Sequence, residues 1–423
     1  MTSSPGNAPS GAAVPTGSPL VARSVIVDDP GDLIALLPPT SPLAWMHRGQ
    51  GLVGWGEVAR LDSRGPGRFE EADRWWRDLA AHSVVRDEAR IPGSGLVAFG
   101  SFAYADDPGA SVLVVPEVVV GRRGSTCWVT TIGRGSVSPP PRLIPTEPPS
   151  QPAGAVFADG AMSGAEWELV VADAVSRIKA GRLDKVVLAR DLIAELDEPL
   201  DVRTPLARLA GKYPACWTFH VSGLFGSTPE MLVRRERGLV ASRVLAGTIR
   251  RTGDDAHDLT LAATLARSSK DLEEHEFAVR SVADALAPYC TSMNVPEAPF
   301  VLHLPNVMHL ATDVTGVLDS DASSLALAAA LHPSAAVGGT PTADAVAIIR
   351  EIERLDRGRY AGPVGWIDAD GDGEWGIALR CAAHQGSRVQ LFAGCGIVAD
   401  SDPAAELAEA AAKFIPVRDA LCD

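Results

Sequence analysis

Two acidic pairs in the sequence have the spacing of residues on one face of a helix. Asp271 and Glu274 form the first pair. Glu406 and Glu409 form the second, and Lys413 follows Glu409 by four residues. If two such helices face each other across a cleft, their carboxylates form the oxygen-rich kind of site that Mg²⁺ prefers. The same spacing also fits solvated helix faces with an intrahelical Glu–Lys pair.

Single polar residues in apolar surroundings form a second group of candidates. Lys185 precedes a short apolar run, and Glu230 follows the segment Gly-Ser-Thr-Pro. Arg380 ends another apolar run. Each of them taken alone fits an ordinary charge at the edge of a strand. Lone histidines such as His275 and His309 are more often structural than catalytic.

Two segments rich in small residues, 332–341 and 392–398, could bring backbone close to a ligand. Exposed backbone N–H groups can bind carboxylate oxygens, although tight packing between elements explains these segments equally well. A third segment, 368–374, imitates the start of a calcium-binding EF-hand loop. Its twelfth position is Leu379 instead of the bidentate glutamate, and its flanks resemble strands, so we expect a hairpin turn there.

The elements that must position these residues mix helices and strands without a regular βαβ period. The clearest helix begins after Ser163, which forms a capping-box pattern with Glu166, and Gly181 is its stop signal. Further helices are predicted at 70–81, 271–286, 343–354 and 403–421. Strands are predicted at 95–102, 110–120, 186–189, 217–221, 231–235, 364–367, 375–381 and 389–392.

Composition divides the chain into three parts. Residues 1–20 are small and rich in Ser, Gly and Pro, which predicts a disordered tail. The Pro-rich stretch 138–155 is typical of a connector. We therefore expect a mostly β N-terminal part at 21–155 and a catalytic region at 156–423.

The overall charge restricts the partners. A net charge of -15 argues against nucleic-acid or membrane-surface binding, both of which require basic patches. The six cysteines lack the spacing of a zinc site or a disulfide framework, which favours a reducing cytoplasm. The first residues lack the pattern of a signal peptide, and no run is long and apolar enough to span a bilayer. We expect a cytoplasmic protein. Because the chain is acidic overall, an anionic ligand would need a positively charged residue at its binding site.

Taken in order, the segments from about 160 to 415 resemble the chorismate-utilising enzymes, and most closely the isochorismate synthases. The blocks that carry the resemblance are KVVLAR (185–190), GSTPEML (226–232), LAGTIRR (245–251), SSKDLEEHE (268–276), NVMHLAT (306–312), LHPSAAVGGTP (331–341), DRGRYAGPVGW (356–366), GDGEWGIALRCA (371–382) and FAGCGIVADSDP (392–403). The implied fold is a single α/β (α+β) domain like anthranilate synthase component I, with a large, mostly antiparallel sheet system covered by helices.

The resemblance also implies a reaction, in which chorismate gains water at C2 and loses its C4 hydroxyl. Lys185 is similar to the base that activates the water, and Glu230 to the acid that protonates the departing hydroxyl. A lysine acts as a base only when its pKa is lowered, and a glutamate as an acid only when its pKa is raised.

Further site residues are implied in the same way. The implied Mg²⁺ ligands are Glu274 and Glu409, with Asp271 and Glu406 acting through metal-bound water. The implied substrate-binding residues are Gly247, Thr248, His309, Tyr360, Arg380, Gly394 and Lys413. Mg²⁺ would stabilise charge on the ring carboxylate, while Arg380 could hold the other carboxylate through two parallel hydrogen bonds.

Positions that differ among relatives favour water as the nucleophile. Anthranilate synthases typically have Gln in place of Lys185, and aminodeoxychorismate synthases commonly have Lys in place of Ala246. No glutamine amidotransferase segment is visible, so no such partner is expected. Ser269, Thr228 and Asp271 depart from common family residues without removing a proposed catalytic group.

Two alternatives remain open. A salicylate synthase would share Lys185 and Glu230 and would go on to eliminate pyruvate. A silent ligand-binding homologue would keep the fold without the reaction. Whether the product feeds menaquinone, a siderophore or salicylate is also open.

Overall fold

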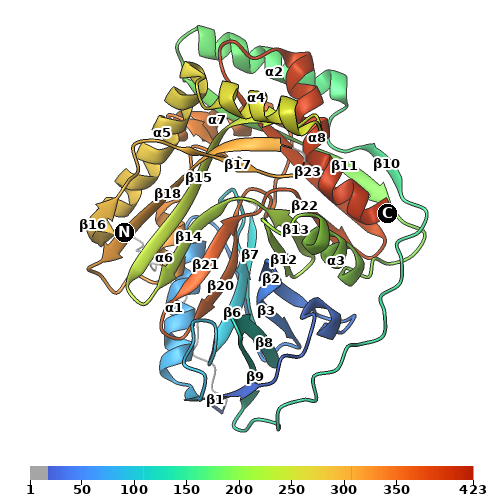
Figure 1. The fold of residues 1–423 in the computed structure, drawn as a ribbon, viewed down its shortest axis with the longest axis vertical. Helices are drawn as coiled ribbons and strands as arrows, with labels where there is room; N and C mark the ends of the chain where they lie inside the picture. The colour runs from blue at the N-terminus through green and yellow to red at the C-terminus, as the bar shows by residue number, and fades with distance from the viewer. Residues whose placement is uncertain (1–17, 108, 306, 423) are drawn as a thin grey trace, which may run out of the picture.

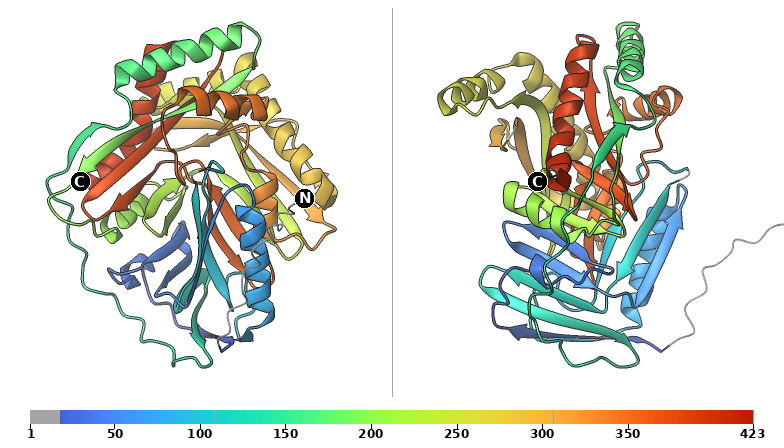
Figure 2. Two further views of the ribbon diagram at one scale, coloured as in Figure 1. Left: turned by 180° about the vertical axis from the view of Figure 1, so that it is seen from behind. Right: turned by 90° about the vertical axis from the view of Figure 1, so that its right-hand side faces the viewer.

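Two large β-sheets form the framework of the molecule, and helices cover them (Figure 1). The computed structural model describes residues 18–107, 109–305 and 307–422. One sheet has 13 strands and the other has 10. The N-terminal strands lie at one end of the molecule, and α2, α5, α7 and α8 lie towards the other (Figures 1 and 2).

The first sheet has the strand order β10 (Val156–Asp159), β11 (Lys185–Glu195), β23 (Arg388–Ile397), β22 (Cys381–Gln385), β13 (Leu224–Thr228), β12 (Trp217–Val221), β2 (Leu43–His47), β3 (Gln50–Trp55), β8 (Val118–Arg123), β9 (Thr126–Arg134), β1 (Leu20–Val27) and β5 (Val84–Asp87), with β19 (Gly339–Thr340) beside β11. The second has the order β16 (Cys290–Asn294), β18 (Val307–Leu318), β15 (Leu239–Arg250), β14 (Met231–Glu236), β21 (Gly373–Ile377), β20 (Pro363–Asp368), β6 (Val97–Ser101), β7 (Ala110–Val115) and β4 (Ala59–Arg64), with β17 (Phe300–His303) beside β18.

The helices are α1 (Arg68–Ala81), α2 (Gly164–Lys179), α3 (Arg203–Lys212), α4 (Asp255–Leu265), α5 (Ser269–Leu286), α6 (Ser324–Ala330), α7 (Thr342–Ile352) and α8 (Pro403–Cys422), with short 3₁₀ turns at Ile34–Leu36 and Ala287–Tyr289. The long ladders β11–β23 and β15–β18 are antiparallel, whereas β1 and β5 pair in parallel. The predicted fold, a mostly antiparallel sheet system covered by helices, is confirmed.

The chain passes from one sheet to the other beside two of the predicted site residues. Glu230 lies between β13 of the first sheet and β14 of the second, and Arg380 lies between β21 of the second and β22 of the first. The two crossovers are bonded to each other: the Ile377 N–H donates to the Glu230 carbonyl, and the Ser227 N–H donates to the Arg380 carbonyl. Both side chains are therefore fixed where the sheets meet.

Strands from the N-terminal part belong to both sheets. β2 pairs with β12 in the first sheet, and β6 pairs with β20 in the second. Trp45 on β2 also donates a 2.7 Å hydrogen bond to Glu374 on β21, which links the sheets. The connector at 138–155 contains no helix or strand, and β10 follows it.

Several predicted elements are confirmed. The capping box of Ser163 and Glu166 is present at the start of α2. The segment resembling an EF-hand is the turn between β20 and β21, where an Asp368 carboxylate oxygen accepts from the N–H groups of Asp370 and Asp372. Of the predicted tail, residues 1–17 lie outside the described residues, and β1 begins at Leu20, whose side chain is buried.

Other predictions about elements were wrong in their extent. The predicted strand 110–120 is two strands, β7 and β8, because Pro116 lies between them and cannot donate to a ladder. The predicted strand 375–381 ends at Ile377, and Arg380 lies in the following turn with a φ of 49°. Within the described residues, no helix combines the length and the apolar character needed to cross a membrane.

Candidate active site

One cavity of about 410 Å³ brings the predicted site residues together. Its lining includes every one of them: Lys185, Glu230, Gly247, Thr248, Asp271, Glu274, His309, Tyr360, Arg380, Gly394, Glu406, Glu409 and Lys413. Volume alone would not have identified this site, because a cavity of about 590 Å³ beside β16 is lined by none of these residues.

Lys185 opens β11 and enters the cavity from the first sheet. Its ammonium forms an ion pair with the carboxylate of Glu274 on α5. The neighbouring strand β23 leaves room for the lysine because it has Gly396 there: a Cβ at this position would lie 2.7 Å from Cε and 3.3 Å from Nζ of Lys185. A glycine is therefore needed next to the amine.

Glu230 is the buried acid of the cavity. Its side chain is 6% exposed. Burial raises its pKa to about 8, although the positive charges of Lys185 and Arg380 oppose the shift. A carboxyl group in this environment is protonated at neutral pH and can donate a proton.

Helix α5 is docked so that its acidic face reaches the cavity. His275, next to Glu274, lies 2.7 Å from the Thr312 hydroxyl and 3.3 Å from the Ala246 carbonyl. Burial lowers the pKa of His275, so the ring is neutral and structural. Gly247 forms a bulge in β15 with a φ of 79°, and a Cβ there would lie 3.2 Å from the Asp271 Cβ. The bulge thus lets β15 and α5 approach each other closely.

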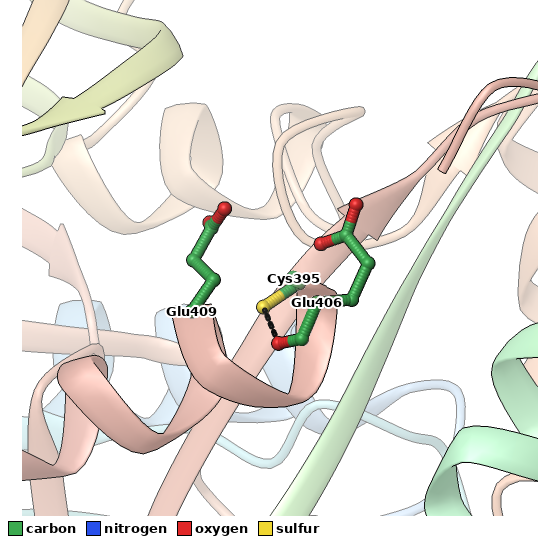
Figure 3. Close-up of side chains that lie close together, drawn as sticks. All are labelled: Cys395, Glu406 and Glu409. Carbon is green, nitrogen blue, oxygen red and sulfur yellow. Dashed lines mark hydrogen bonds between the residues drawn. The ribbon is translucent and has the colours of Figure 1, made fainter. Parts of the chain in front are cut away.

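Helix α8 presents the second acidic face (Figure 3). Lys413 donates to the Gly394 carbonyl at 2.9 Å and pairs with Glu409 at 2.5 Å. Burial is the largest single influence on the pKa of Glu409 and would raise it, but the charge and hydrogen bond of Lys413, with Arg380 and Cys395, together lower it. The Ser401 hydroxyl donates to Glu406 at 2.7 Å. Two acidic helices therefore contribute to one cavity, a choice that the residue spacing alone had left open.

His309 and Tyr360 complete the polar wall. His309 Nδ1 lies 2.9 Å from the Thr248 hydroxyl, whereas its buried Nε2 has no hydrogen-bond partner among the described residues. Burial, with Arg380 and Lys413 nearby, lowers the pKa of His309 to about 3, so the ring is neutral. Tyr360 stacks on Phe392, and burial raises its pKa. A buried, unpartnered ring nitrogen in a cavity is expected to meet a ligand.

The four carboxylates of α5 and α8 are suitable ligands for Mg²⁺. Asp271, Glu274, Glu406 and Glu409 all line the cavity. Burial raises the pKa of the neighbouring Cys395 to about 12, so its thiol is protonated. Hard carboxylate oxygens suit Mg²⁺, and a thiol does not.

Some lining residues had not been singled out from the sequence. They include Ser401, Gly396 and Arg357. Arg357 is occupied by a buried ion pair with Glu353 and by the carbonyls of Val187 and Val337. Gly396 and Ser401 both lie in the block 392–403 that carries the family resemblance. Their roles become visible only in the structure, where Gly396 leaves room for Lys185 and Ser401 donates to Glu406.

The architecture and this site define a class of protein. The family described as chorismate binding enzyme matches residues 143–422, and the chain belongs to that family. Within it, the chain is similar to several proteins named isochorismate synthases.

Three relatives illustrate the similarity. The salicylate biosynthesis isochorismate synthase of Pseudomonas aeruginosa is 34% identical over 412 residues, covering 90% of this chain and 85% of that protein. Isochorismate synthase MenF of Bacillus subtilis is 37% identical over 260 residues, covering 60% of this chain and 55% of that protein. The crystal structure of a putative 2,3-dihydroxybenzoate-specific isochorismate synthase, DhbC, from Bacillus anthracis has a TM-score of 0.76 and 31% identity, covering 92% of this chain and 98% of that one. The match to the Bacillus subtilis MenF thus spans about half of that relative's length.

Proposed function

We propose that this chain converts chorismate to isochorismate in a Mg²⁺-dependent reaction that adds water at C2 and removes the C4 hydroxyl. One observation carries the proposal: Lys185, Glu230 and the acidic faces of α5 and α8 line a single cavity. The similarity to proteins named isochorismate synthases supports the same reaction. The chorismate-binding region is then 156–423, which includes every proposed site residue.

Glu230 acts as the general acid. With a pKa of about 8 it carries a proton at neutral pH, and that proton passes to the oxygen of the departing C4 hydroxyl. Burial excludes water that would otherwise stabilise the carboxylate form. Desolvation is the largest cause of the raised pKa. The burial of the carboxyl group is therefore what keeps it protonated and able to act as an acid.

Lys185 acts as the general base. Without substrate its ammonium pairs with Glu274, which keeps the amine inside the cavity. To take a proton from water it must leave this pair and lose its own proton. Lys185 lies on β11, which pairs with β23, whereas Glu230 lies at the crossover between the sheets, so the base and the acid come from different elements.

The acidic residues would hold Mg²⁺, with Glu274 and Glu409 as direct ligands and Asp271 and Glu406 acting through water. When bound, the ion would stabilise negative charge on the ring carboxylate of the substrate. Lys185 and Lys413, which now neutralise Glu274 and Glu409, would become available to the substrate.

The remaining cations recognise the substrate anion. Arg380 and Tyr360 would hold the enolpyruvyl carboxylate, and Arg380 can do so through paired N–H donors. Lys413, Gly394, Gly247 and Thr248 surround the carboxylates, and the unpartnered Nε2 of His309 faces the ring. An acidic chain can thus bind a dianion, because the cations are concentrated in the cavity.

Product analysis tests the proposal. Purified protein is incubated with chorismate and Mg²⁺, without any amidotransferase partner, and the products are separated. Isochorismate supports the proposal, whereas salicylate with pyruvate indicates a salicylate synthase, and unchanged chorismate indicates a silent homologue. Lys185→Ala should abolish turnover, while Lys212→Ala, on α3 with an exposed ion pair to Asp419, should not.

A further inference from the structure

A gap in the first sheet lies beside the strand that carries Lys185. One side of β11 is paired almost throughout with β23, whereas the other side meets two short strands. β19 pairs with residues 185–186, and β10 pairs with residues 192–195. Among the described residues, no strand pairs with residues 187–191 on that side. Buried backbone groups in such a gap need other hydrogen-bond partners.

Glu353 and Arg357 supply such partners with their side chains. The Arg357 guanidinium donates to the Val187 carbonyl at 2.7 Å. The Glu353 carboxylate accepts from the Ala189 N–H at 2.8 Å. One donor and one acceptor are what a residue of a neighbouring strand would offer. The two side chains thus take the place of a strand residue beside Leu188.

This pair is buried and held in one geometry. Arg357 is 4% exposed and Glu353 is 1% exposed. Two hydrogen bonds of 2.6 Å join the guanidinium to the carboxylate, and the guanidinium lies 4.3 Å from the centre of the Tyr104 ring. Burying two charges costs desolvation, and apolar side chains of similar size often stabilise a fold as well or better. Apolar side chains, however, could not bond the backbone of β11.

The same arginine also fixes the segment that runs back to Lys185. It donates to the Val337 carbonyl at 2.9 Å. The Val187 N–H donates to the next carbonyl of that segment, also at 2.9 Å. Two residues further on, Thr340 pairs with Lys185 in the ladder of β19 and β11. Arg357 therefore holds both the strand that carries the lysine and the segment beside it.

We propose that Glu353 and Arg357 are positioning residues for Lys185. They act through the backbone of β11 and not through contact with the substrate. On the other side of β11, Val187 lies opposite Gly396, the residue that leaves room for the lysine. Without the pair, β11 can shift in the gap and the amine moves with it, and a shift of about 1 Å can cost about 10²-fold in rate. The inference rests on the proposed function, in which Lys185 is the base.

Replacing the arginine by lysine tests the proposal. Arg357→Lys keeps the charge, but one ammonium group cannot reproduce the planar contacts of a guanidinium to a carboxylate and two carbonyls. We expect kcat to fall about tenfold or more, while KM for chorismate and the Mg²⁺ titration stay within about twofold of the parent values. Arg177→Lys is the matched control, because Arg177 pairs with Glu351 on α7 outside the cavity lining, and it should keep kcat. An unchanged kcat in Arg357→Lys would overturn the proposal.

A combined substitution shows whether the effect passes through the lysine. Gly396→Ala is expected to displace the same amine. Adding Arg357→Lys to Gly396→Ala should therefore lower kcat by less than about threefold more, because one displaced base cannot be lost twice. Losses that multiply in the double variant would contradict positioning of Lys185 and would indicate an independent structural effect.

Hydrogen exchange tests the replacement of a strand without any turnover. The backbone amides of residues 186–190 should exchange about tenfold faster in Arg357→Lys than in the parent or in Arg177→Lys, because the gap can open. Equal exchange in the three proteins would refute the replacement. If the parent does not consume chorismate, the proposed function fails, whereas the exchange rates still decide what Glu353 and Arg357 do for β11.

A second variant covers the case in which Arg357→Lys does not fold, as circular dichroism and thermal unfolding would show. Glu353→Leu combined with Arg357→Met removes both buried charges, so neither partner is left unpaired. This protein should fold, show the same loss of kcat and exchange faster at residues 186–190. Parent-like kcat and exchange in this protein would overturn the proposal.

Discussion

Two glutamates of one cavity have pKa values shifted in opposite directions. Desolvation raises the pKa of the buried Glu230 to about 8, although the positive charges of Lys185 and Arg380 oppose the shift. Glu409 is also largely buried, but its direct ion pair with Lys413 lowers its pKa. In the proposed reaction the same side chain is thus a proton donor at one position and a cation ligand at the other, because their immediate partners differ.

The acid role of Glu230 predicts a pH profile. Because the acid must carry its proton in the free enzyme, kcat/KM should fall as the pH rises through about 8. Glu230→Gln should lose about 10²-fold or more of the activity and should lack this limb in its residual rate. Glu236→Gln, at the end of β14, where Glu236 pairs with Arg123 outside the cavity lining, is the control and should keep both rate and profile. A parent profile that is flat from pH 7 to 9 would contradict the assignment.

The same pKa shift predicts a stability cost. Between about pH 4.5, the usual carboxyl value, and pH 8, the unfolded chain loses the Glu230 proton while the folded chain keeps it. Stability therefore falls as the pH rises, by about 1.4 kcal/mol per pH unit for this group. Glu230→Gln removes this dependence, so its Tm relative to the parent should be higher at pH 8 than at pH 5. Calorimetry that gives the same Tm difference at both pH values would refute the shift.

At the scale of elements, α5 and α8 act as a pair from opposite parts of the chain. Both were predicted from the sequence, at 271–286 and 403–421, and both are confirmed. Each helix is docked on a strand by a specific contact, His275 to Thr312 for α5 and Lys413 to Gly394 for α8. The acidic faces meet because of these docking contacts, which residue spacing within each helix cannot predict.

Because both helices are proposed to supply metal ligands, loss of a ligand from either one should weaken Mg²⁺ binding. Glu409→Ala should raise the Mg²⁺ concentration needed for half-maximal activity at least tenfold, because a direct ligand is lost. Glu276→Ala is a matched control, since Glu276 lies on α5 and pairs with Arg280 in an exposed ion pair. Isothermal titration with Mg²⁺ measures the effect directly. An unchanged titration for Glu409→Ala would remove Glu409 from the ligand set.

Because β23 lies so close to Lys185, a side chain added at Gly396 should displace the lysine without changing any charge. In Gly396→Ala the new methyl group meets the Lys185 side chain at 2.7 Å, and the lysine must move. A displaced base should lower kcat about 10²-fold, while chorismate binding and the fold are retained. Gly211→Ala on α3 is the control, because nothing lies within 4 Å of its Cβ, and it should be neutral or slightly stabilising. A fully active Gly396→Ala protein would show that the amine position does not matter.

The sequence predicted elements well where local signals agree and poorly elsewhere. α2 has a capping box and a regular apolar face, so its start was correct. The long strands β15 and β18 were missed, because β15 has a bulge at Gly247 and both strands mix polar with apolar residues. Arg380 was assigned to a strand end, because a non-glycine residue in a left-handed turn gives no compositional signal.

Site residues were predicted from the resemblance, since spacing alone could not choose between a metal site and solvated helices. The structure places all of them around one cavity, although their individual roles stay predictions.

At the scale of the whole molecule, the N-terminal part completes both sheets. β2 and β6 border strands of the catalytic region, and Phe102 packs edge-on against Trp375. Removing this part would leave β12 and β20 without the strands β2 and β6 that pair with them, and would expose their edges. The catalytic region is therefore not expected to fold alone, even though the family match covers only residues 143–422.

Truncation tests this dependence. A chain of residues 143–422 should be insoluble or lack a cooperative unfolding transition. A chain that starts at residue 18 is the control and should keep the parent Tm and activity, in line with the predicted disordered tail. A soluble, cooperatively unfolding 143–422 chain would show that the two parts are separable.

The left-handed backbone of Arg380 has a consequence for attempts to make this protein more robust. An L-residue in that conformation costs about 1 kcal/mol or more, and glycine would relieve the cost. Laboratory evolution for heat tolerance would therefore favour glycine at this turn. Such a variant would survive heating better and lose the guanidinium that we propose holds the substrate, so a screen that scores only survival would select against catalysis.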